Sequence, residues 1–330
     1  MDTTIEKINE SSIAKASEII KNGGIVAFPT ETVYGLGVSA YRGESVSKVF
    51  EVKGRPSDNP LIVHIGGIED IGQATENPTP LALKILNKFS PGPITVVVDK
   101  GVKIANEVTA GLDSVGIRIP MLLEARQFIK ACGEPIAAPS ANTSSRPSPT
   151  NAMTVFDDIG GKIPMILDGG SCEVGIESTV VDCRGEIPMI LRSGKITQED
   201  IKNLVGACEI ATDFSKVRSP GVKYKHYSPS CEMLAIFQKD NSFVQAKVDE
   251  LVKQNKNVVL IGEEKLSSID NVIFITLGNT VDDFMKNYYE ALREGETCGD
   301  VIVCVLPFSE HNAEGIYNRV RKSCGGNISL

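Results

Sequence analysis

The sequence has no tryptophan, few aromatic residues and no long apolar run. Aromatic residues make up only 5% of its 330 residues, which argues against the stacking platform that many proteins use to bind single-stranded nucleic acid. No apolar run approaches the ~20 residues that a membrane-spanning helix needs. The first segment, MDTTIEKINESS, is polar and acidic, unlike a secretory signal. We therefore expect a globular, cytoplasmic protein.

The sequence also has fewer positively charged than negatively charged residues. The chain has 34 Lys and Arg residues against 42 Asp and Glu residues, a formal net charge of -8. A protein whose main task is to grip a phosphate backbone is usually basic, so any anion site here must be a local pocket. The eight cysteines form no C-x-x-C pair, as expected of small buried side chains in a reducing compartment.

Several familiar catalytic motifs are missing. The chain has no G-x-x-x-x-G-K-[ST], no G-x-S-x-G and no H-E-x-x-H, and its three histidines belong to no closely spaced Cys/His set. A zinc site is therefore not expected, and no covalent nucleophile has an evident activating partner. Residues 35–40 fit G-x-G-x-x-A, but Tyr41-Arg42-Gly43 interrupts the helix that a dinucleotide site needs at that point.

Apolar periodicity predicts a mixture of strands and helices over the first two thirds of the chain. Gly23-Gly24 ends the first helix, and Thr79-Pro80 and Thr197 are typical helix starts. The expected strands are 25–28, 61–65, 94–99, 115–120, 135–142, 165–168, 178–183 and 187–192, and the expected helices are 12–22, 44–52, 79–89, 122–131 and 198–206. Because the order is not strictly βαβ, we expect an α/β (α+β) domain, residues 1–208, with a mixed twisted sheet.

The pattern changes after this domain. Residues 209–232 lack strong periodicity, contain RSPGVKYKHYSPS and are predicted to form a linker. From 233 to 330, apolar strands and amphipathic helices alternate regularly, which is typical of a small Rossmann-like domain with a parallel sheet. This alternation indicates a fold but does not fix a function.

Polar segments stand at the ends of many expected strands. Each joins an apolar strand to Gly, Pro, Ser or Thr, and loops of this kind suit anion binding. They are 29–36, 53–64, 109–120, 138–150, 175–182 and 190–194. On the proline-stiffened turn that begins at residue 53, Lys53 and Arg55 could grip a triphosphate, with solvated turn charges as the alternative.

Two polar side chains fall within apolar strands. Taken alone, His64 is more typical of a satisfied core histidine than of a ligand contact. Arg118 needs an anionic partner, because burying an unpaired charge is costly. That partner is either a bound ligand or an Asp or Glu of the core.

Together, PTETVYGLG, K-x-R-P-x-x-N-P-L-I-V-H, A-P-S-A-N and E-S-T-V closely resemble the YrdC-like family, and SPGVKYKHYSP with the domain after it resembles the two-domain threonylcarbamoyl-AMP synthases. The resemblance covers nearly the whole chain, with the segments in the family's order. It implies that L-threonine, bicarbonate and ATP are converted to threonylcarbamoyl-adenylate and pyrophosphate. Partner proteins would then transfer the threonylcarbamoyl group to tRNA, and Mg²⁺ would be held mainly by the ATP phosphates and water.

The same resemblance assigns roles to individual residues. It implies that Lys53 and Arg55 are catalytic, and that Arg118 clamps the threonine carboxylate. The implied threonine contacts are Thr32, His64, Arg118, Ala138 and Ser178, and the implied ATP contacts are Lys53, Arg55, Asn59, Ser114, Ser140, Ser148, Arg192 and Tyr224. We expect the linker around Tyr224 to fold over the pocket as a lid that excludes water, with a plain solvated tether as the alternative.

Two other functions remain open on the sequence. A YrdC-like domain could serve as an RNA-binding module, although the acidity of the chain and its few aromatic residues disfavour this. A related carbamoyl transfer, feeding assembly of a metal centre, usually comes with acylphosphatase and zinc-finger segments, and neither is recognisable here.

Overall fold

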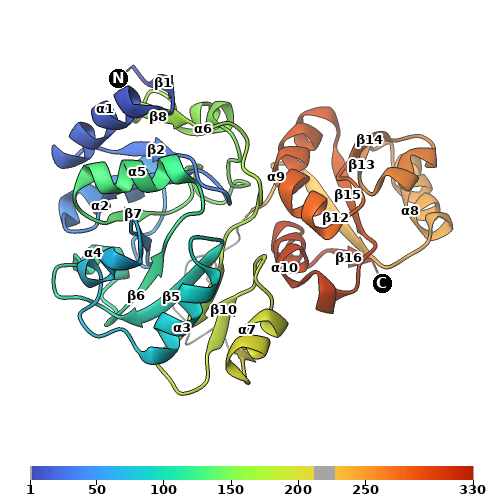
Figure 1. The fold of residues 1–330 in the computed structure, drawn as a ribbon. Helices are drawn as coiled ribbons and strands as arrows, with labels where there is room; N and C mark the ends of the chain where they lie inside the picture. The colour runs from blue at the N-terminus through green and yellow to red at the C-terminus, as the bar shows by residue number, and fades with distance from the viewer. Residues whose placement is uncertain (1, 212–226, 330) are drawn as a thin grey trace. The chain divides into compact units, whose positions relative to one another are not determined.

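A large mixed sheet forms the framework of the N-terminal part of the protein (Figure 1). Among the residues that the computed structural model describes, 2–211 and 227–329, it has eleven strands. In spatial order these are β1 (Thr4–Lys7), β8 (Met165–Asp168), β2 (Val26–Phe28), β3 (Gly35–Ser39), β7 (Ile136–Ala138), β4 (Ile62–His64), β6 (Ser114–Arg118), β5 (Ile94–Asp99), β9 (Thr179–Asp182), β10 (Met189–Arg192) and β11 (Glu209–Ile210). Parallel and antiparallel pairs both occur, so the sheet is mixed as predicted.

The helices of this part begin where the sequence supplies caps. The Thr79 side chain accepts a hydrogen bond from the Ala82 N–H at the start of α3 (Pro80–Phe89), and Thr197 and Asp200 form a capping box on α7 (Gln198–Val205). The other helices are α1 (Glu10–Lys21), α2 (Gly43–Lys53), α4 (Asn106–Thr109), α5 (Leu123–Cys132) and α6 (Ala152–Ile159), with a 3-10 helix η1 (Ile68–Gln73).

Two large apolar clusters cover the sheet, and a small third one joins Val97, Val180, Leu191 and Ala211. The larger one packs α2, α3 and α6 against residues such as Val63 and Ile117. The smaller one packs α1 and α5, which lie together in Figure 1, against Val26, Phe28 and Ile136. Because successive residues of a strand point to opposite faces, neighbouring residues such as Val26 and Ala27 belong to different clusters.

A parallel sheet forms the framework of the second unit. Within the described residues its strand order is β14 (Ile273–Thr276), β13 (Val258–Gly262), β15 (Val301–Leu306), β12 (Glu232–Phe237) and β16 (Ile328–Ser329). Its helices are α8 (Asn241–Lys253), α9 (Val281–Cys298) and α10 (Glu314–Ser323), with 3-10 helices η2 (Glu264–Ser268) and η3 (Glu310–Asn312). This unit also includes Ser145–Ser148 and Val174–Ile176.

The predicted fold class is confirmed, and the main error concerns the G-x-G-x-x-A segment. Gly35–Ser39 forms β3, a central strand that the sequence did not predict. Its glycines accommodate a neighbouring ring: a Cβ atom at Gly37 would lie 2.9 Å from Phe28 and from Ile136. β1, α4, α6, β11 and β16 were also missed. No helix among the described residues has the length and apolar character needed to cross a bilayer.

Candidate functional site

Alternation along β6 directs a set of polar side chains to one face of the large sheet. Val115 and Ile117 belong to the larger core, so Ser114, Gly116 and Arg118 point to the opposite face. We call this opposite face, over β7, β4, β6, β5 and β9, the site face. Gly116 has no side chain, so it leaves space on this face between Ser114 and Arg118.

The two strands next to β6 follow the same rule. In β4 and β7, Val63 and Ala137 belong to the larger core, so His64 and Ala138 point to the site face. Across the parallel β4–β6 ladder, His64 is in register with Arg118. Three of the predicted threonine contacts, His64, Arg118 and Ala138, therefore share the site face.

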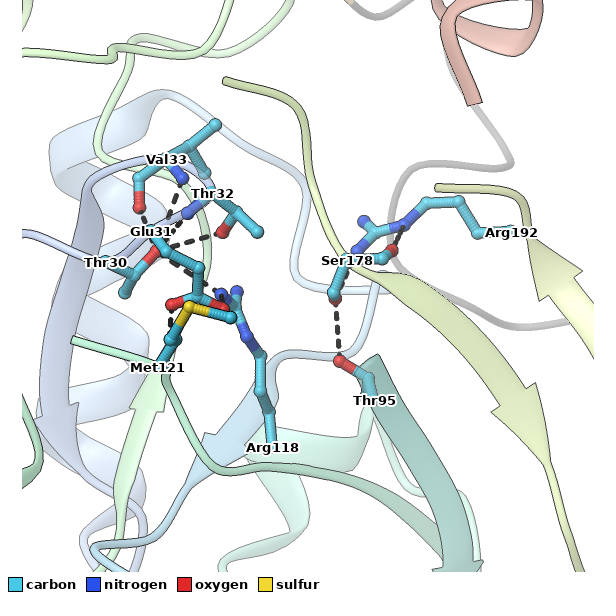
Figure 2. Close-up of polar contacts among 9 residues, drawn as sticks. All are labelled: Thr30, Glu31, Thr32, Val33, Thr95, Arg118, Met121, Ser178 and Arg192. Atoms are coloured by element: carbon cyan, nitrogen blue, oxygen red, sulfur yellow. Dashed lines mark hydrogen bonds and ion pairs between the residues drawn. The ribbon is translucent and has the colours of Figure 1, made fainter. Parts of the chain in front are cut away.

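A fourth predicted threonine contact, Ser178, reaches the site face from the β5 and β9 side of the sheet. Val96 of β5 pairs with Ile117 of β6, which places Thr95 in the row of Arg118. The Thr95 Oγ1 atom lies 2.8 Å from Ser178 Oγ, and Arg192 donates from Nε to the Ser178 carbonyl at 3.0 Å and from Nη2 to Ser178 Oγ at 3.1 Å (Figure 2). All three side chains are buried, so Ser178 is held from two sides.

Arg118 has an internal anionic partner, the alternative that the sequence left open. Its Nη2 donates to Glu31 Oε1 at 2.7 Å, with both side chains about 5% exposed or less, and also to Thr30 Oγ1 at 3.4 Å. The Arg118 Nε atom is buried and has no hydrogen-bond partner among the described residues. Pairing with Glu31 therefore leaves a donor of the guanidinium available to a ligand.

Thr32 lies in the turn that carries Glu31. The Thr30 hydroxyl donates to the Val33 carbonyl at 2.7 Å and accepts from the N–H groups of Thr32 at 3.2 Å and Val33 at 3.3 Å. The Thr32 and Thr30 hydroxyls are 2.9 Å apart, and Thr32 is fully buried. Figure 2 shows this turn beside the Arg118 guanidinium. The structure thus brings Thr32 together with Arg118.

Lys53 lies at the end of α2 and is almost entirely buried, at 2% exposed. Its Nζ atom donates to the carbonyl oxygens of Ser140 and Asn142 and, at 3.3 Å, to Asn142 Oδ1. Burial, with a smaller contribution from the nearby Arg55 charge, lowers the pKa of Lys53 well below its ordinary value. Three acceptors match the three protons of an ammonium group and favour the charged form against the cost of burial, so Lys53 offers its surroundings mainly charge.

Arg55 and Asn59 occupy the turn that follows α2. Arg55 Nη2 donates to the Asn59 carbonyl at 3.3 Å, and its guanidinium lies 6.0 Å from the centre of the Phe50 ring. Asn59 is 2% exposed, and its Nδ2 donor has no partner among the described residues. A buried donor without a partner is costly, so the Asn59 amide, like the Arg118 Nε, is a donor that the described residues leave unsatisfied.

The predicted contacts thus form two groups. Thr32, His64, Arg118 and Ser178 gather near the carboxyl ends of β4 and β6. The second group, near the amino ends of these strands, consists of Lys53, Arg55, Asn59, Ser114 and Ser140, and Ala138 lies between the groups, in register with Ile62. At ~3.3 Å per residue, Ser114 and Arg118 are separated by about 13 Å along β6.

His64 combines features of a core residue and of a site residue. It is 4% exposed, its Nδ1 lies 3.2 Å from the Ile62 carbonyl, and its ring meets the edge of Phe28 with centroids 5.8 Å apart. Burial, followed by the Arg118 charge, lowers the pKa of His64 from 6.5 to about 3. At neutral pH the imidazole is uncharged, so it can contact a ligand only as a neutral donor or acceptor.

Three predicted ATP contacts, Ser148, Tyr224 and Arg192, are not placed in the second group. Ser148 is buried, but its segment belongs to the second unit. Tyr224 and most of the predicted lid, residues 212–226, lie outside the described residues. Arg192 is buried against Ser178 and so lies nearer the threonine group than the phosphate group.

Three polar residues of the site escaped the sequence reasoning: Glu31, Thr95 and Asn142. Glu31 was hidden in the PTETV segment, where only Thr32 was singled out. Its signal was the requirement that Arg118 have an anionic partner. Asn142 was visible as part of A-P-S-A-N, and Thr95 as the one polar residue inside the apolar run ITVVV.

Comparisons with known proteins identify the family of the chain. Residues 18–194 match the family model of the Sua5, YciO and YrdC proteins, described as "Telomere recombination", and residues 196–325 match the model described as "Threonylcarbamoyl-AMP synthase, C-terminal domain". The threonylcarbamoyl-AMP synthase of Pyrococcus abyssi is 38% identical over 98% of this chain and 97% of its own length. That of Bacillus subtilis is 39% identical over 99% and 97%.

A solved structure gives the same result. The crystal structure of P. abyssi Sua5 complexed with L-threonine matches with a TM-score of 0.92 and 37% identity, covering 99% of this chain and 98% of that one. The matched family model and the matched structure define the class: a YrdC-like enzyme with a second, C-terminal domain. The chain belongs to the threonylcarbamoyl-AMP synthase family. The family, the fold and the enzymatic activity implied by the sequence resemblance are confirmed.

Proposed function

We propose that the protein condenses L-threonine, bicarbonate and ATP into threonylcarbamoyl-AMP and pyrophosphate, with the amino acid and the triphosphate bound at opposite ends of β4 and β6. The relatives' name states the product, and one relative has been crystallised with L-threonine. The observation that carries the substrate assignment is the buried Arg118 guanidinium, whose Nε donor has no partner among the described residues.

The amino acid binds at the carboxyl ends of the strands. Arg118 receives the threonine carboxylate through charge-assisted hydrogen bonds. Ser178, fixed by Thr95 and Arg192, and the Thr32 turn provide hydroxyl and backbone contacts. His64, being neutral, contributes a hydrogen bond or an apolar wall without adding charge, and Ala138 contributes its backbone.

The triphosphate binds at the amino ends. Arg55 and the Asn59 amide donate hydrogen bonds to phosphate oxygens, and the hydroxyls of Ser114 and Ser140 provide further contacts. Lys53 contributes its charge and holds the Ser140–Asn142 segment in place. Ser148, Arg192 and Tyr224 complete the proposed nucleotide contacts.

The reaction needs positioning and charge neutralisation rather than an enzyme nucleophile. The threonine amine adds to CO₂ derived from bicarbonate and loses a proton, which gives a carbamate. A carbamate oxygen then attacks the α-phosphorus, and the bond from this phosphorus to the bridging oxygen breaks as pyrophosphate leaves. The positive charges of Lys53 and Arg55 stabilise the negative charge that develops on the phosphates. The fixed site holds the carbamate and the α-phosphate in contact.

Mg²⁺ enters this proposal with the nucleotide. Its ligands would be mainly phosphate oxygens and water. The ion would neutralise part of the triphosphate charge. The further proposals from the sequence are transfer of the product to tRNA by partner proteins, a cytoplasmic location, division of the chain at 208 and 232, and a lid in the linker.

Release of pyrophosphate tests the proposed reaction. The purified protein is incubated with ATP, MgCl₂, bicarbonate and L-threonine, and pyrophosphate is followed by a coupled assay while threonylcarbamoyl-AMP is identified by mass spectrometry. We expect product only when all substrates are present, and none when valine replaces threonine. Equal pyrophosphate release without threonine would contradict the proposal.

A further inference from the structure

A buried ion pair joins the Thr30–Val33 turn to β6. Glu31 and Arg118 are 5% and 4% exposed, and Glu31 Oε1 accepts from Arg118 Nη2 at 2.7 Å (Figure 2). The two residues are 87 positions apart in the sequence. Nothing assigned to the reaction so far includes Glu31.

The Glu31 carboxylate is itself held firmly. Its second oxygen, Oε2, accepts from the Met121 backbone N–H at 2.9 Å, just beyond the end of β6. Its backbone lies in the turn that the Thr30 hydroxyl stabilises through Thr32 and Val33. A carboxylate fixed through both oxygens can fix the orientation of the guanidinium that it binds.

This contact takes only one nitrogen of the guanidinium. The two hydrogen bonds given above, to Glu31 and to Thr30, both start at Nη2, while Nε is buried without a partner among the described residues. Glu31 therefore holds Arg118 from one side and leaves a donor for a ligand on another.

The pair also sets the charge of this end of the site. Glu31 and Arg118 together are neutral, and His64, in register with Arg118, is uncharged at neutral pH. The buried Arg192, which contacts Ser178, and the buried Glu177, which precedes Ser178, add one charge of each sign. An amino acid is a zwitterion, with one charge of each sign, so it matches a fixed pair of opposite charges. A ligand with only negative charge gains from Arg118 but is repelled by Glu31.

We propose that Glu31 is a positioning and specificity-determining residue: it orients Arg118 toward the substrate carboxylate and makes this end of the site selective for a zwitterionic amino acid over an anion. The inference rests on the proposed function, because it takes the Arg118 ligand to be the threonine carboxylate. Glu31 acts through Arg118 and through its charge, and no direct chemical step is assigned to it.

The test compares threonine with its analogue 2,3-dihydroxybutyrate, in which a hydroxyl replaces the amine. In Glu31→Gln, which keeps the shape but removes the charge, we expect KM for threonine to rise about tenfold, as for loss of one charge-assisted contact. The inhibition constant of the analogue should stay the same or fall, because this ligand has no ammonium group, and relief of its repulsion by Glu31 offsets the poorer orientation of Arg118. The ratio of the two constants therefore changes by at least tenfold, while KM for ATP stays within twofold.

Two further variants separate positioning from folding. Glu69→Gln removes an ion pair of the same length, 2.7 Å, from an exposed site, and should change neither constant. Glu31→Asp keeps the charge and should keep the preference for threonine over the analogue even where the shorter side chain raises KM. If Glu31→Gln does not fold, as judged by thermal unfolding, Glu31→Asp decides: loss of its preference overturns the inference.

A double mutant shows whether Glu31 acts through Arg118. In an Arg118→Ala background, Glu31→Gln should not raise KM for threonine again by about tenfold, because no guanidinium remains to be oriented, and a full additive rise would overturn the inference. Parallel rises in KM for ATP and threonine with an unchanged analogue ratio would also overturn it, since they indicate a structural role. If Arg118→Ala leaves KM for threonine unchanged, the proposed function is wrong. If Arg118→Ala raises this KM but Glu31→Gln changes neither it nor its ratio to the inhibition constant of the analogue, only the inference about Glu31 is wrong.

Discussion

The two ends of β4 and β6 each carry a buried cation, but the cations are satisfied in opposite ways. Lys53 is surrounded by uncharged oxygens of Ser140 and Asn142, so its positive charge is not cancelled by a direct carboxylate partner. Arg118 is paired with Glu31, so it contributes little net charge but a well-oriented donor. This difference suits the proposed ligands. A triphosphate requires net positive charge, whereas a zwitterionic amino acid requires a well-oriented donor and little net charge.

Replacing Lys53 should have the largest effect. Lys53→Met removes the charge and frees three acceptors, each of which is worth roughly 1.5–3 kcal/mol to a charged donor. We expect kcat/KM for ATP to fall by at least roughly 100-fold, with KM for threonine within threefold. Pyrophosphate release at varied ATP measures this.

Lys48→Met is the matched control, because Lys48 is an exposed residue of the same helix, α2. It should behave as the unmodified protein does. A Lys53→Met protein that keeps its KM for ATP, or loses affinity for threonine alone, would break the comparison between the two ends.

Arg118→Lys should affect the other substrate. The variant keeps the charge but loses the planar fork, and loss of a charge-assisted hydrogen bond costs about 1.5–3 kcal/mol. KM for threonine should rise roughly 10-fold to 150-fold, with KM for ATP nearly constant. Arg184→Lys, at a more exposed ion pair with Asp182, should have no effect. A larger change for ATP than for threonine would contradict the assignment.

The pH dependence of stability tests whether His64, at the threonine end, is uncharged. Its pKa is lowered from 6.5 to about 3, so between these values the unfolded chain binds a proton that the folded chain does not. Stability therefore falls as the pH falls through this window, by about 2 kcal/mol between pH 7 and pH 5 from this group.

Denaturant unfolding followed by circular dichroism measures this contribution. His64→Gln should lose about 2 kcal/mol less than the unmodified protein on going from pH 7 to pH 5, while His311→Gln, at an exposed position, should keep the original pH dependence. Identical pH dependence in all three proteins would show that His64 does not remain neutral in the fold.

The smallest effect is expected at Thr95. Thr95→Val keeps the shape but removes the hydroxyl that contacts Ser178, at a cost of about 1 kcal/mol, so kcat/KM for threonine should fall roughly fivefold. Thr95→Ser should restore it. Thr179→Val, which removes a hydrogen bond to the Ile196 carbonyl, should lower stability only. An equal loss of kcat/KM in Thr179→Val would place Thr95 outside the threonine end.

The sequence predicted most local structure and missed contacts between distant segments. Caps at Thr79 and Thr197 located α3 and α7 because capping depends on neighbouring residues. β3 was missed because its glycines have low strand propensity, and the packing of Phe28 and Ile136 against them explains their presence. The pairing of Glu31 with Arg118 and of Lys53 with Asn142 spans 87 and 89 positions, which periodicity cannot reveal.

A crystal structure of the protein with L-threonine and a non-hydrolysable ATP analogue tests the central claim most directly. We predict the threonine carboxylate within 3.2 Å of an Arg118 nitrogen, a hydrogen-bond distance, and the triphosphate against Arg55 and Asn59 at the other end of β4. Threonine bound beside Lys53, or phosphates bound against Arg118, would contradict the division of the site into a phosphate end at Lys53 and an amino-acid end at the Glu31–Arg118 pair.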